Sequence, residues 1–303
     1  MIKHLKKTRI LILIMLAVLI FSGILFQSYN TNSLEIVNLA LETEDNLFMR
    51  AEIIIPSKTA GGSMPLVTIG HGFKGTLNSG GARELAERLA KNGVATIRMD
   101  YNHFTDKMCI EKTNQYDLES MIEDQLLCIN YMRNNYNIDD ERIGLYARSM
   151  GGRVAMIMAN KSLGGINYKG LALVAPAGND IAMKHYMGGQ DSWTKMKKEA
   201  NLNGFVWYQG LKLEKNWFDL FEEYNPAKDG NTYKESVLVI YNTLDNVVTP
   251  ETSIECCKAY KNNILYKVTT QDGHGYEMSY ENSKLKNEIM TEIVDYFITQ
   301  FDV

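Results

Sequence analysis

The stretch Tyr146-Ala147-Arg148-Ser149-Met150-Gly151-Gly152 decides the fold, because it joins an apolar, strand-like run to a helix-like segment. A sharp strand-to-helix turn holds its central residue in a strained backbone conformation, so the residues two positions away must be nearly free of side chain. Ala147 and Gly151 meet that requirement. The pattern predicts a nucleophile elbow that presents the hydroxyl of Ser149. The alternative is a tight turn that happens to contain a serine.

The rest of the chain predicts the sheet in which this turn lies. Short apolar runs alternate mainly with segments of helical spacing, which is typical of buried parallel strands and of a doubly wound α/β sheet. A hairpin of residues 34–41 and 47–55 leads into that sheet. The other expected strands are residues 66–69, 94–99, 142–146, 171–174, 237–241 and 265–268, and the expected helices are residues 82–91, 118–134, 151–160, 253–261 and 285–301.

One segment interrupts the alternation, between Pro176 and about Pro226, and it contains all three tryptophans of the chain. Insertions that cover the carboxyl end of a sheet commonly form a substrate pocket, and aromatic walls suit apolar or aromatic groups. The alternative, which we expect for most of these aromatic residues, is a small core within the insertion itself. We therefore predict a cap at about residues 177–227 within a domain of residues 31–303.

Residues 1–30 have the pattern of a targeting segment. Four basic residues within the first nine precede an uncharged run from Ile10 to Phe26, which predicts an N-terminal apolar helix. The run is long for a signal-peptide core and only just long enough to span a membrane, so a cleaved signal peptide and an uncleaved membrane anchor are both open. The positive-inside tendency predicts that the domain lies outside the cytoplasmic membrane, either anchored by this helix or secreted after cleavage.

The charge of the remaining domain excludes one class of partner. Without the four basic residues of the targeting segment, 36 acidic residues stand against 28 basic ones. Lysine and arginine form no dense run after residue 30, so the sequence has no nucleic-acid-binding footprint.

The four cysteines do not predict a metal site. Cys109, Cys128, Cys256 and Cys257 have neither C-x-x-C spacing nor histidine pairs nearby. An exported location permits a disulfide, and Cys109 with Cys128 is the pair to test, with a buried core thiol at Cys128 as the alternative. We expect at least one of the two adjacent cysteines to serve in packing.

A serine nucleophile needs a base and a third group that orients the base. His274 follows the last predicted strand, and Asp245 follows the strand before it. The order Ser149, Asp245, His274, with gaps of 96 and 29 residues, is the order that one family of folds uses. Singly, His274 could be a loop histidine and Asp245 a turn residue, but the joint match is far more specific. Asp272 is the nearest rival acid, although two residues from His274 it is poorly placed to orient that ring.

An oxyanion hole needs one backbone N–H after the nucleophile and a second from the loop before the first large helix. Met150 is the candidate for the first donor. The second is expected from Gly70-His71-Gly72-Phe73-Lys74-Gly75, where glycines allow the backbone to turn its N–H groups inward, and we choose Phe73. A phosphate-binding loop is excluded because Gly75 is followed by Thr-Leu rather than by Lys-Ser or Lys-Thr.

Together these motifs resemble those of the α/β-hydrolases, and most of all the bacterial cinnamoyl and feruloyl esterase type. The His-Gly-Phe loop, the inserted cap and the late histidine loop Gln271-Asp272-Gly273-His274-Gly275 carry the resemblance, which covers about residues 34–301. It implies that Ser149, Asp245 and His274 form a catalytic triad and that Phe73 and Met150 supply the oxyanion donors.

Three details of the chain depart from that family's pattern. The elbow begins with Ala147 rather than glycine, and Arg148 replaces the histidine that is common there. The stretch Asp100-Tyr101-Asn102-His103 lacks the glycines that are usual after its strand. None of these changes removes a catalytic group, so the reaction type is predicted more firmly than the substrate.

The expected activity is hydrolysis of a small-molecule carboxylic ester through an acyl-serine, with no metal or organic cofactor. The sequence makes no prediction of the oligomeric state. One alternative is a serine peptidase or aminopeptidase for short peptides, and a second is a catalytically silent α/β-hydrolase that binds a ligand or a partner. An acidic cluster that grips a free amine would favour the peptidase. The residues available for it, at a spacing more typical of a solvated face, are Glu214, Asp219, Glu222 and Glu223.

Overall fold

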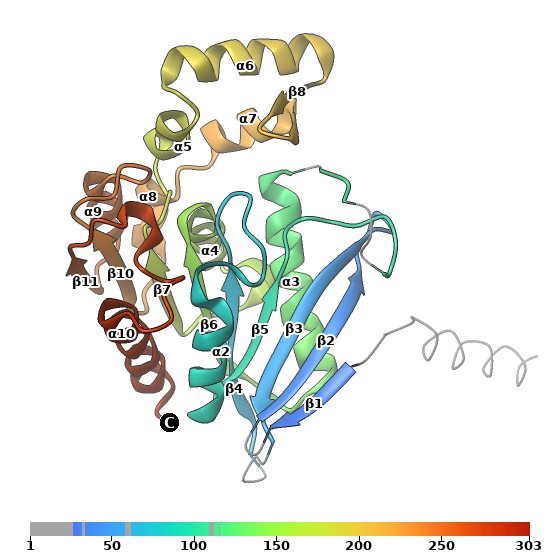
Figure 1. Cartoon of the computed structure of the whole chain (residues 1–303), viewed down its shortest axis with the longest axis vertical. Coiled ribbons are helices and arrows are strands. Elements are labelled where there is room, and N and C mark those ends of the chain that lie inside the picture. Colours follow the sequence, from blue (N-terminus) through green and yellow to red (C-terminus); the bar gives the residue numbers. More distant parts are fainter. Residues whose placement is uncertain (1–26, 32–33, 58–61, 109–111, 115) are drawn as a thin grey trace, which may run out of the picture.

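The structure is a computed structural model that describes residues 27–31, 34–57, 62–108, 112–114 and 116–303 (Figure 1). The predicted N-terminal apolar helix lies outside these residues. Among the residues described, no helix combines the length and the apolar character needed to cross a membrane. Cys109, one half of the disulfide pair to be tested, also lies outside them.

A nine-stranded sheet forms the centre of the described domain, in the order β1-β2-β3-β5-β4-β6-β7-β10-β11. Neighbours from β1 to β5 run antiparallel, and every neighbouring pair from β5 to β11 runs parallel. The prediction of a mainly parallel α/β sheet is therefore confirmed. The strands are β1 (Gln27–Thr31), β2 (Leu34–Glu42), β3 (Phe48–Pro56), β4 (Met64–Gly70), β5 (Ala95–Met99), β6 (Ile138–Arg148), β7 (Gly170–Val174), β10 (Val237–Asn242) and β11 (Asn263–Val268).

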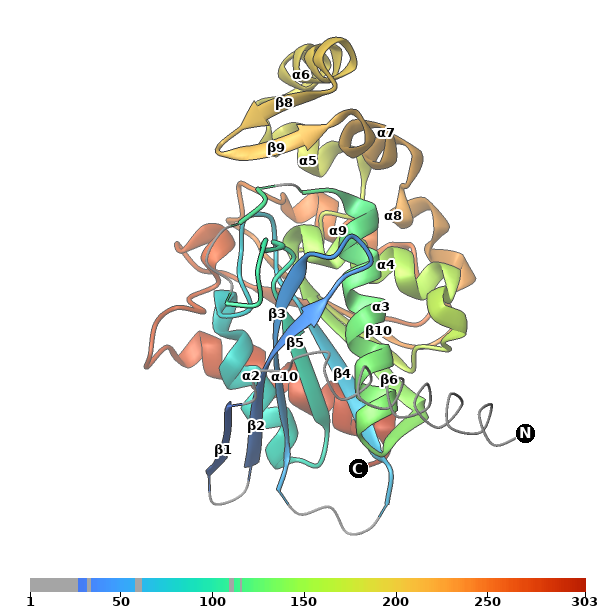
Figure 2. The same cartoon turned by 90° about the vertical axis from the view of Figure 1, so that its right-hand side faces the viewer.

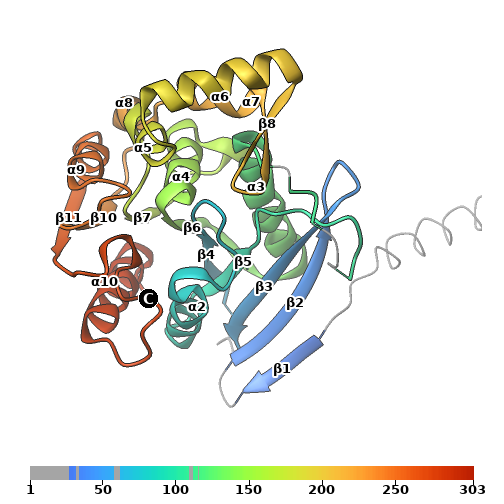
Figure 3. The same cartoon turned by 45° about the horizontal axis from the view of Figure 1, so that its top comes forward.

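Helices cover both faces of the sheet (Figure 3). The side chains of α2 (Ala82–Lys91) and α10 (Lys284–Phe301) share one apolar core with the sheet, and those of α3 (Leu118–Asn135), α4 (Ser149–Lys161) and α9 (Pro250–Lys258) belong to the other. In α10, Ile289, Ile293, Phe297 and Phe301 are buried at four-residue spacing, so a single apolar stripe seats the helix on the sheet.

Strand register places the loops that matter beside one another. Gly70 at the end of β4 pairs with Ala147 near the end of β6, so the loop after β4 begins next to the Ser149 turn. Asn242 at the end of β10 pairs with Val268 at the end of β11. Because the carboxyl ends of parallel strands meet at one edge of the sheet, all four loops converge there.

The segment between β7 and β10 stands over that edge (Figures 1 and 2). It consists of α5 (Asp180–Tyr186), α6 (Gln190–Asn203), the antiparallel hairpin β8 (Phe205–Tyr208) and β9 (Leu211–Glu214), α7 (Lys215–Glu223) and α8 (Pro226–Asp229). Trp193 packs on Phe218 and Trp217 packs on Phe221, with ring centroids 4.9 and 4.5 Å apart. These four side chains are buried, but their core is continuous with that of the domain, since the Trp217 ring also lies 5.5 Å from that of Phe73 in the loop after β4.

One buried arginine fastens this inserted segment to the helix that begins at Ser149. Arg153, on α4, donates hydrogen bonds to the carbonyls of Ala177 and Asn179 after β7, and to those of Phe221 and Tyr224 at the end of α7. Its guanidinium also lies 4.5 Å from the centre of the Phe221 ring. Burial lowers the pKa of Arg153 to about 10, so the side chain is still a cation at neutral pH.

The three described cysteines are buried free thiols, Cys128 on α3 and the pair Cys256 and Cys257 on α9. Both members of the adjacent pair serve in packing. Burial raises the pKa of Cys256 to about 12 and that of Cys257 to about 11. These thiols are therefore protonated at neutral pH, and core packing accounts for them.

Candidate active site

Ser149 occupies the sharp turn between β6 and α4 with a φ of 52°, in the left-handed region that side chains rarely adopt. The loop after β4 comes so close that a Cβ on Gly151 would lie 2.3 Å from the carbonyl oxygen of His71. A Cβ on Gly72 would lie 3.0 Å from the Cβ of Ser149. The small residues are therefore needed because two backbones meet at this turn, and the geometry is that of a nucleophile elbow.

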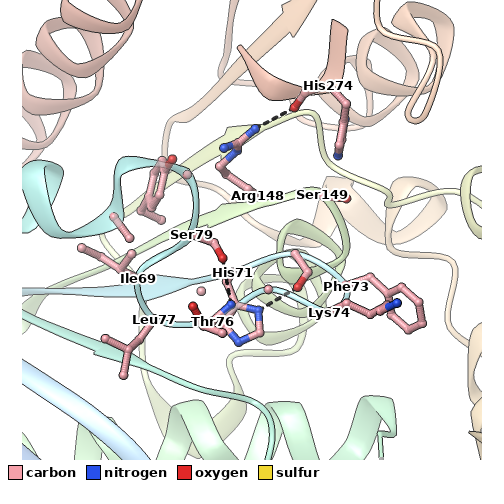
Figure 4. Close-up of a pocket in the computed structure, with 16 residues that line it drawn as sticks. Ile69, His71, Phe73, Lys74, Thr76, Leu77, Ser79, Arg148, Ser149 and His274 are labelled. Atoms are coloured by element: carbon pink, nitrogen blue, oxygen red, sulfur yellow. Dashed lines mark hydrogen bonds between the residues drawn. The ribbon is translucent and has the colours of Figure 1, made fainter. Parts of the chain in front are cut away.

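His274 lies above Ser149, and its ring points toward the serine (Figure 4). The imidazole Nδ1 is 2.7 Å from Oδ2 of Asp245, which is buried in the loop after β10. The structure thus brings together the three residues that the sequence selected. The rival Asp272 is turned elsewhere, because its carboxylate accepts hydrogen bonds from the N–H of Glu277 and from the hydroxyl of Tyr280.

The carboxylate of Asp245 has donors on both oxygens. Oδ1 accepts from the backbone N–H groups of Val247 and Val248, at 2.9 and 3.1 Å. Oδ2 accepts from the hydroxyl of Tyr276 at 3.3 Å as well as from His274. A buried carboxylate is tolerated only when such partners replace water, and these donors also fix which oxygen faces the imidazole.

Asn242 joins the Asp245 loop to the His274 loop, a role that the sequence analysis missed. Its side-chain amide donates to the carbonyls of Thr270 and Gly273, and its Oδ1 accepts from the N–H groups of Leu244 and Thr270. The residue is fully buried. A polar residue at the end of an otherwise apolar strand is the only signal that could have pointed to it.

The two proposed oxyanion donors both lie beside Ser149. Met150 belongs to the first turn of α4, whose N–H groups have no partner within the helix. Phe73 lines both cavities that meet at Ser149, and in the described part of the chain its N–H makes no hydrogen bond. Two free N–H groups beside a serine are what a developing oxyanion requires.

His71, which the sequence analysis left without a role, sets the direction of the Phe73 N–H. Its Nε2 accepts a hydrogen bond from the N–H of Tyr101 at 3.0 Å, so Nδ1 carries the proton and donates to the carbonyl of Gly72 at 2.7 Å. The N–H of Gly75 donates to the same carbonyl. Because the C=O of Gly72 and the N–H of Phe73 belong to one trans peptide and point in opposite directions, fixing the first fixes the second.

This arrangement predicts a loss of stability in acid. Burial lowers the pKa of His71 to about 4, whereas in the unfolded chain it is about 6.5. Between these values the unfolded chain binds more protons, so stability is complete above pH 6.5 and falls by up to about 3 kcal/mol as the pH drops to 4. Urea unfolding at pH 7, 5 and 4 measures this loss. The gap in unfolding free energy between wild type and His71→Gln should shrink as the pH falls, and parallel pH curves would contradict the prediction.

Two cavities meet at Ser149 and His274, of about 230 and 140 Å³. The smaller cavity lies under α5 and is lined by apolar side chains such as Met183 and Val248. Because a cavity of about 150 Å³ holds a benzene ring, each cavity has room for a group of about that size. The larger one extends between the elbow and the loop after β4 (Figure 4).

Arg148, a departure from the family pattern, connects the elbow to the His274 loop. Its Nη2 donates to the carbonyl of His274 at 2.8 Å (Figure 4) and to that of Gly275 at 3.4 Å. The guanidinium also lies 5.6 Å from the centre of the Tyr276 ring.

The acidic residues that would favour a peptidase do not surround the nucleophile. Asp219 and Glu222 form ion pairs with Lys197 at 2.9 and 2.7 Å, and Glu214 pairs with Lys212 at 2.8 Å. None of the four acidic residues lines either cavity at Ser149. Three of the four are paired with lysines and Glu223 is exposed, so these residues form a solvated face, as the alternative interpretation held.

Comparison with known proteins identifies the fold. Residues 63–206 match the family model described as serine aminopeptidase, S33. No curated protein sequence matches the chain. Among solved structures, Est1E from Butyrivibrio proteoclasticus with ferulic acid bound is 24% identical, with 86% of this chain and 98% of that chain covered and a TM-score of 0.67. An acetyl xylan esterase from Paenibacillus sp. R4 is 16% identical over 90% of this chain and 87% of that chain, with a TM-score of 0.64. The chain therefore has the α/β-hydrolase fold, and the family and solved structures that it resembles are hydrolases, mostly esterases.

Proposed function

We propose that this protein cleaves carboxylic esters through an acyl-serine intermediate. The observation that carries the proposal is a strained serine at an elbow beneath a histidine whose Nδ1 lies 2.7 Å from a buried carboxylate. Ser149 is the nucleophile, His274 is the general base, and Asp245 orients the base. The bound ferulic acid of one similar structure adds support for a hydroxycinnamate or other aryl group.

In this mechanism His274 takes the proton of Ser149 while the hydroxyl oxygen attacks the ester carbonyl. The tetrahedral oxyanion forms between the N–H groups of Phe73 and Met150, which stabilise its charge. His274 then gives the proton to the departing alcohol, which leaves the acyl group on Ser149. Water attacks the acyl-serine by the same steps, with His274 again acting as base and then as acid.

A serine aminopeptidase is the second candidate, and the description of the matching family model favours it. Against it stands the absence of carboxylates from the described residues that line the two cavities, because a free amine is recognised by acidic groups.

A location outside the cytoplasmic membrane, anchored or secreted, is also part of the proposal and rests on the charge pattern of residues 1–30 alone.

The purified full-length chain tests the proposal with a fluorophosphonate probe and a substrate panel. Mass spectrometry of the labelled protein should find the phosphonyl group on Ser149, because an activated serine reacts with such probes. Short aryl esters should be hydrolysed, and aminoacyl p-nitroanilides should not. Labelling of another residue would contradict the mechanism. Faster turnover of the anilides than of the esters would favour the aminopeptidase. A folded protein that turns over neither substrate would support the catalytically silent binding protein.

A further inference from the structure

The larger cavity beside Ser149 carries positive charge without negative charge. Arg148 and Lys74 both line it, and among its described lining residues none is aspartate or glutamate. Neither cation forms an ion pair within the described part of the chain. The domain as a whole has more acidic than basic residues, so the charge of this pocket is opposite in sign to that of the domain.

Of the two cations, Arg148 should attract an anion more strongly, because it is partly buried next to the nucleophile. Its Nη2 donates to the carbonyls of His274 and Gly275, which hold the side chain in place but leave its formal charge uncompensated. The backbone also makes room for it. A Cβ on Gly80, whose φ is 62°, would lie 2.2 Å from Nη1 of Arg148.

Lys74 reaches the same cavity from the loop after β4. Its ammonium group donates to the side-chain carbonyl of Gln209, in the β8–β9 turn, at 3.3 Å. This contact brings no negative charge, so the ammonium is free to attract an anion. Both residues line the cavity, but the Lys74 side chain lies beside Phe73, away from the Arg148 guanidinium (Figure 4), so it contributes positive charge from a separate position.

The smaller cavity offers the opposite chemistry. Its lining is apolar apart from Ser149, His274 and the phenol of Tyr186. An ester carbonyl held at Ser149 consequently has an apolar site on one side and a cationic site on the other. Most neutral esters have no group that uses the second site.

We propose that the substrate is an ester with an anionic group, such as a carboxylate, which lies in the larger cavity against Arg148, with Lys74 adding positive charge to the surroundings, and with a small apolar group in the smaller cavity. This inference rests on the proposed function and names the substrate class of the same site. The anionic group can belong to the acyl part or to the alcohol part of the ester, since the cavity recognises the negative charge whichever part carries it.

Two matched pairs of substrates test the proposal on the full-length chain. The mono-4-nitrophenyl ester of succinic acid is compared with its methyl-capped diester, which places the charge on the acyl side. The second pair, 4-acetoxybenzoate and its methyl ester, places the charge on the alcohol side. In at least one pair kcat/KM should be at least about tenfold higher for the anion, equivalent to about 1.4 kcal/mol. That preference should shrink as NaCl is raised, because salt screens exposed charges.

Variants separate recognition of the anion from positioning of His274. Arg148→Gln should abolish most of the preference and Lys74→Gln part of it, whereas Arg148→Lys should retain some. Lys284→Gln, at a site on α10 that is 93% exposed and lines neither cavity, removes one charge as a control and should leave the preference unchanged. A purely structural Arg148 would instead lower kcat/KM equally for both members of a pair.

The outcomes distinguish this inference from the function on which it rests. Equal hydrolysis of anionic and neutral partners in both pairs by wild type overturns the anion proposal and leaves ester hydrolysis intact. A preference that persists in Arg148→Gln and Lys74→Gln also overturns it. If wild type hydrolyses no ester, the proposed function fails and the substrate class fails with it.

Discussion

Replacing Ser149 with alanine is expected to lower kcat/KM for aryl esters by at least about 10⁴-fold. The substitution removes the only oxygen at the elbow that can form the acyl intermediate, and the remaining activity comes from the oxyanion donors and binding alone. Alanine has a smaller side chain than serine, so the close approach of Gly72 is not made tighter. Initial rates with a 4-nitrophenyl ester, together with circular dichroism of the variant, measure the effect.

Ser79→Ala is the matched control for this prediction. Ser79 lines the larger cavity, but its hydroxyl accepts a hydrogen bond from the N–H of Thr76 and takes no part in the proposed chemistry. We expect kcat/KM to change by only a few-fold. A folded Ser149→Ala protein that keeps more than about a hundredth of wild-type activity would refute the assignment of the nucleophile.

Replacing Asp245 with asparagine is expected to lower kcat by about 10⁴-fold while binding changes little. Asp245 accepts a hydrogen bond from the Nδ1–H of His274, so Nε2 is left free to take a proton from Ser149. An asparagine amide turned toward the ring would donate instead, which favours the wrong tautomer. The backbone donors of Val247 and Val248 hold the other oxygen, so the amide NH₂ is directed toward the imidazole.

The control here is Asp272→Asn, because Asp272 lies two residues from His274 and is the acid that the sequence ranked next. Its contacts are with Glu277 and Tyr280, and we expect kcat to fall by less than about tenfold, since no proton transfer depends on it. The measurement is the pre-steady-state burst of 4-nitrophenol, which reports acylation directly. If Asp272→Asn reduces the burst as strongly as Asp245→Asn, the orienting acid has been misassigned.

Local pattern was sufficient for the elements that face the core. Strands β4, β5 and β7 and helix α2 lie within two residues of their predicted bounds, because strands buried on both faces are apolar throughout. Polar strands were predicted too short. β6 begins four residues before its expected start, since Asp140 and Glu141 are exposed there, and most of the edge strand β11 is exposed. An exposed strand has no apolar pattern from which its ends can be found.

The inserted segment shows a second limit. Its two long helices and its hairpin could not be placed from sequence, because aromatic residues there pack in several directions and follow no single period. The same holds for Arg153, whose partners lie 24 to 71 residues away in the chain. Nothing near Arg153 in the sequence indicates that four carbonyls converge on it.

The sequence by itself determined the fold class and the candidate nucleophile, base and acid, because strand-end motifs in a fixed chain order depend on local residue types. Only the tertiary structure decided how these groups are held. His71 orients the Phe73 N–H through the Gly72 peptide, and Asn242 ties together the loops of Asp245 and His274. It also brought Arg148 and Lys74 to one cavity without an acid. Such contacts join residues far apart in the chain, and their energy depends on burial and direction, which no linear pattern contains.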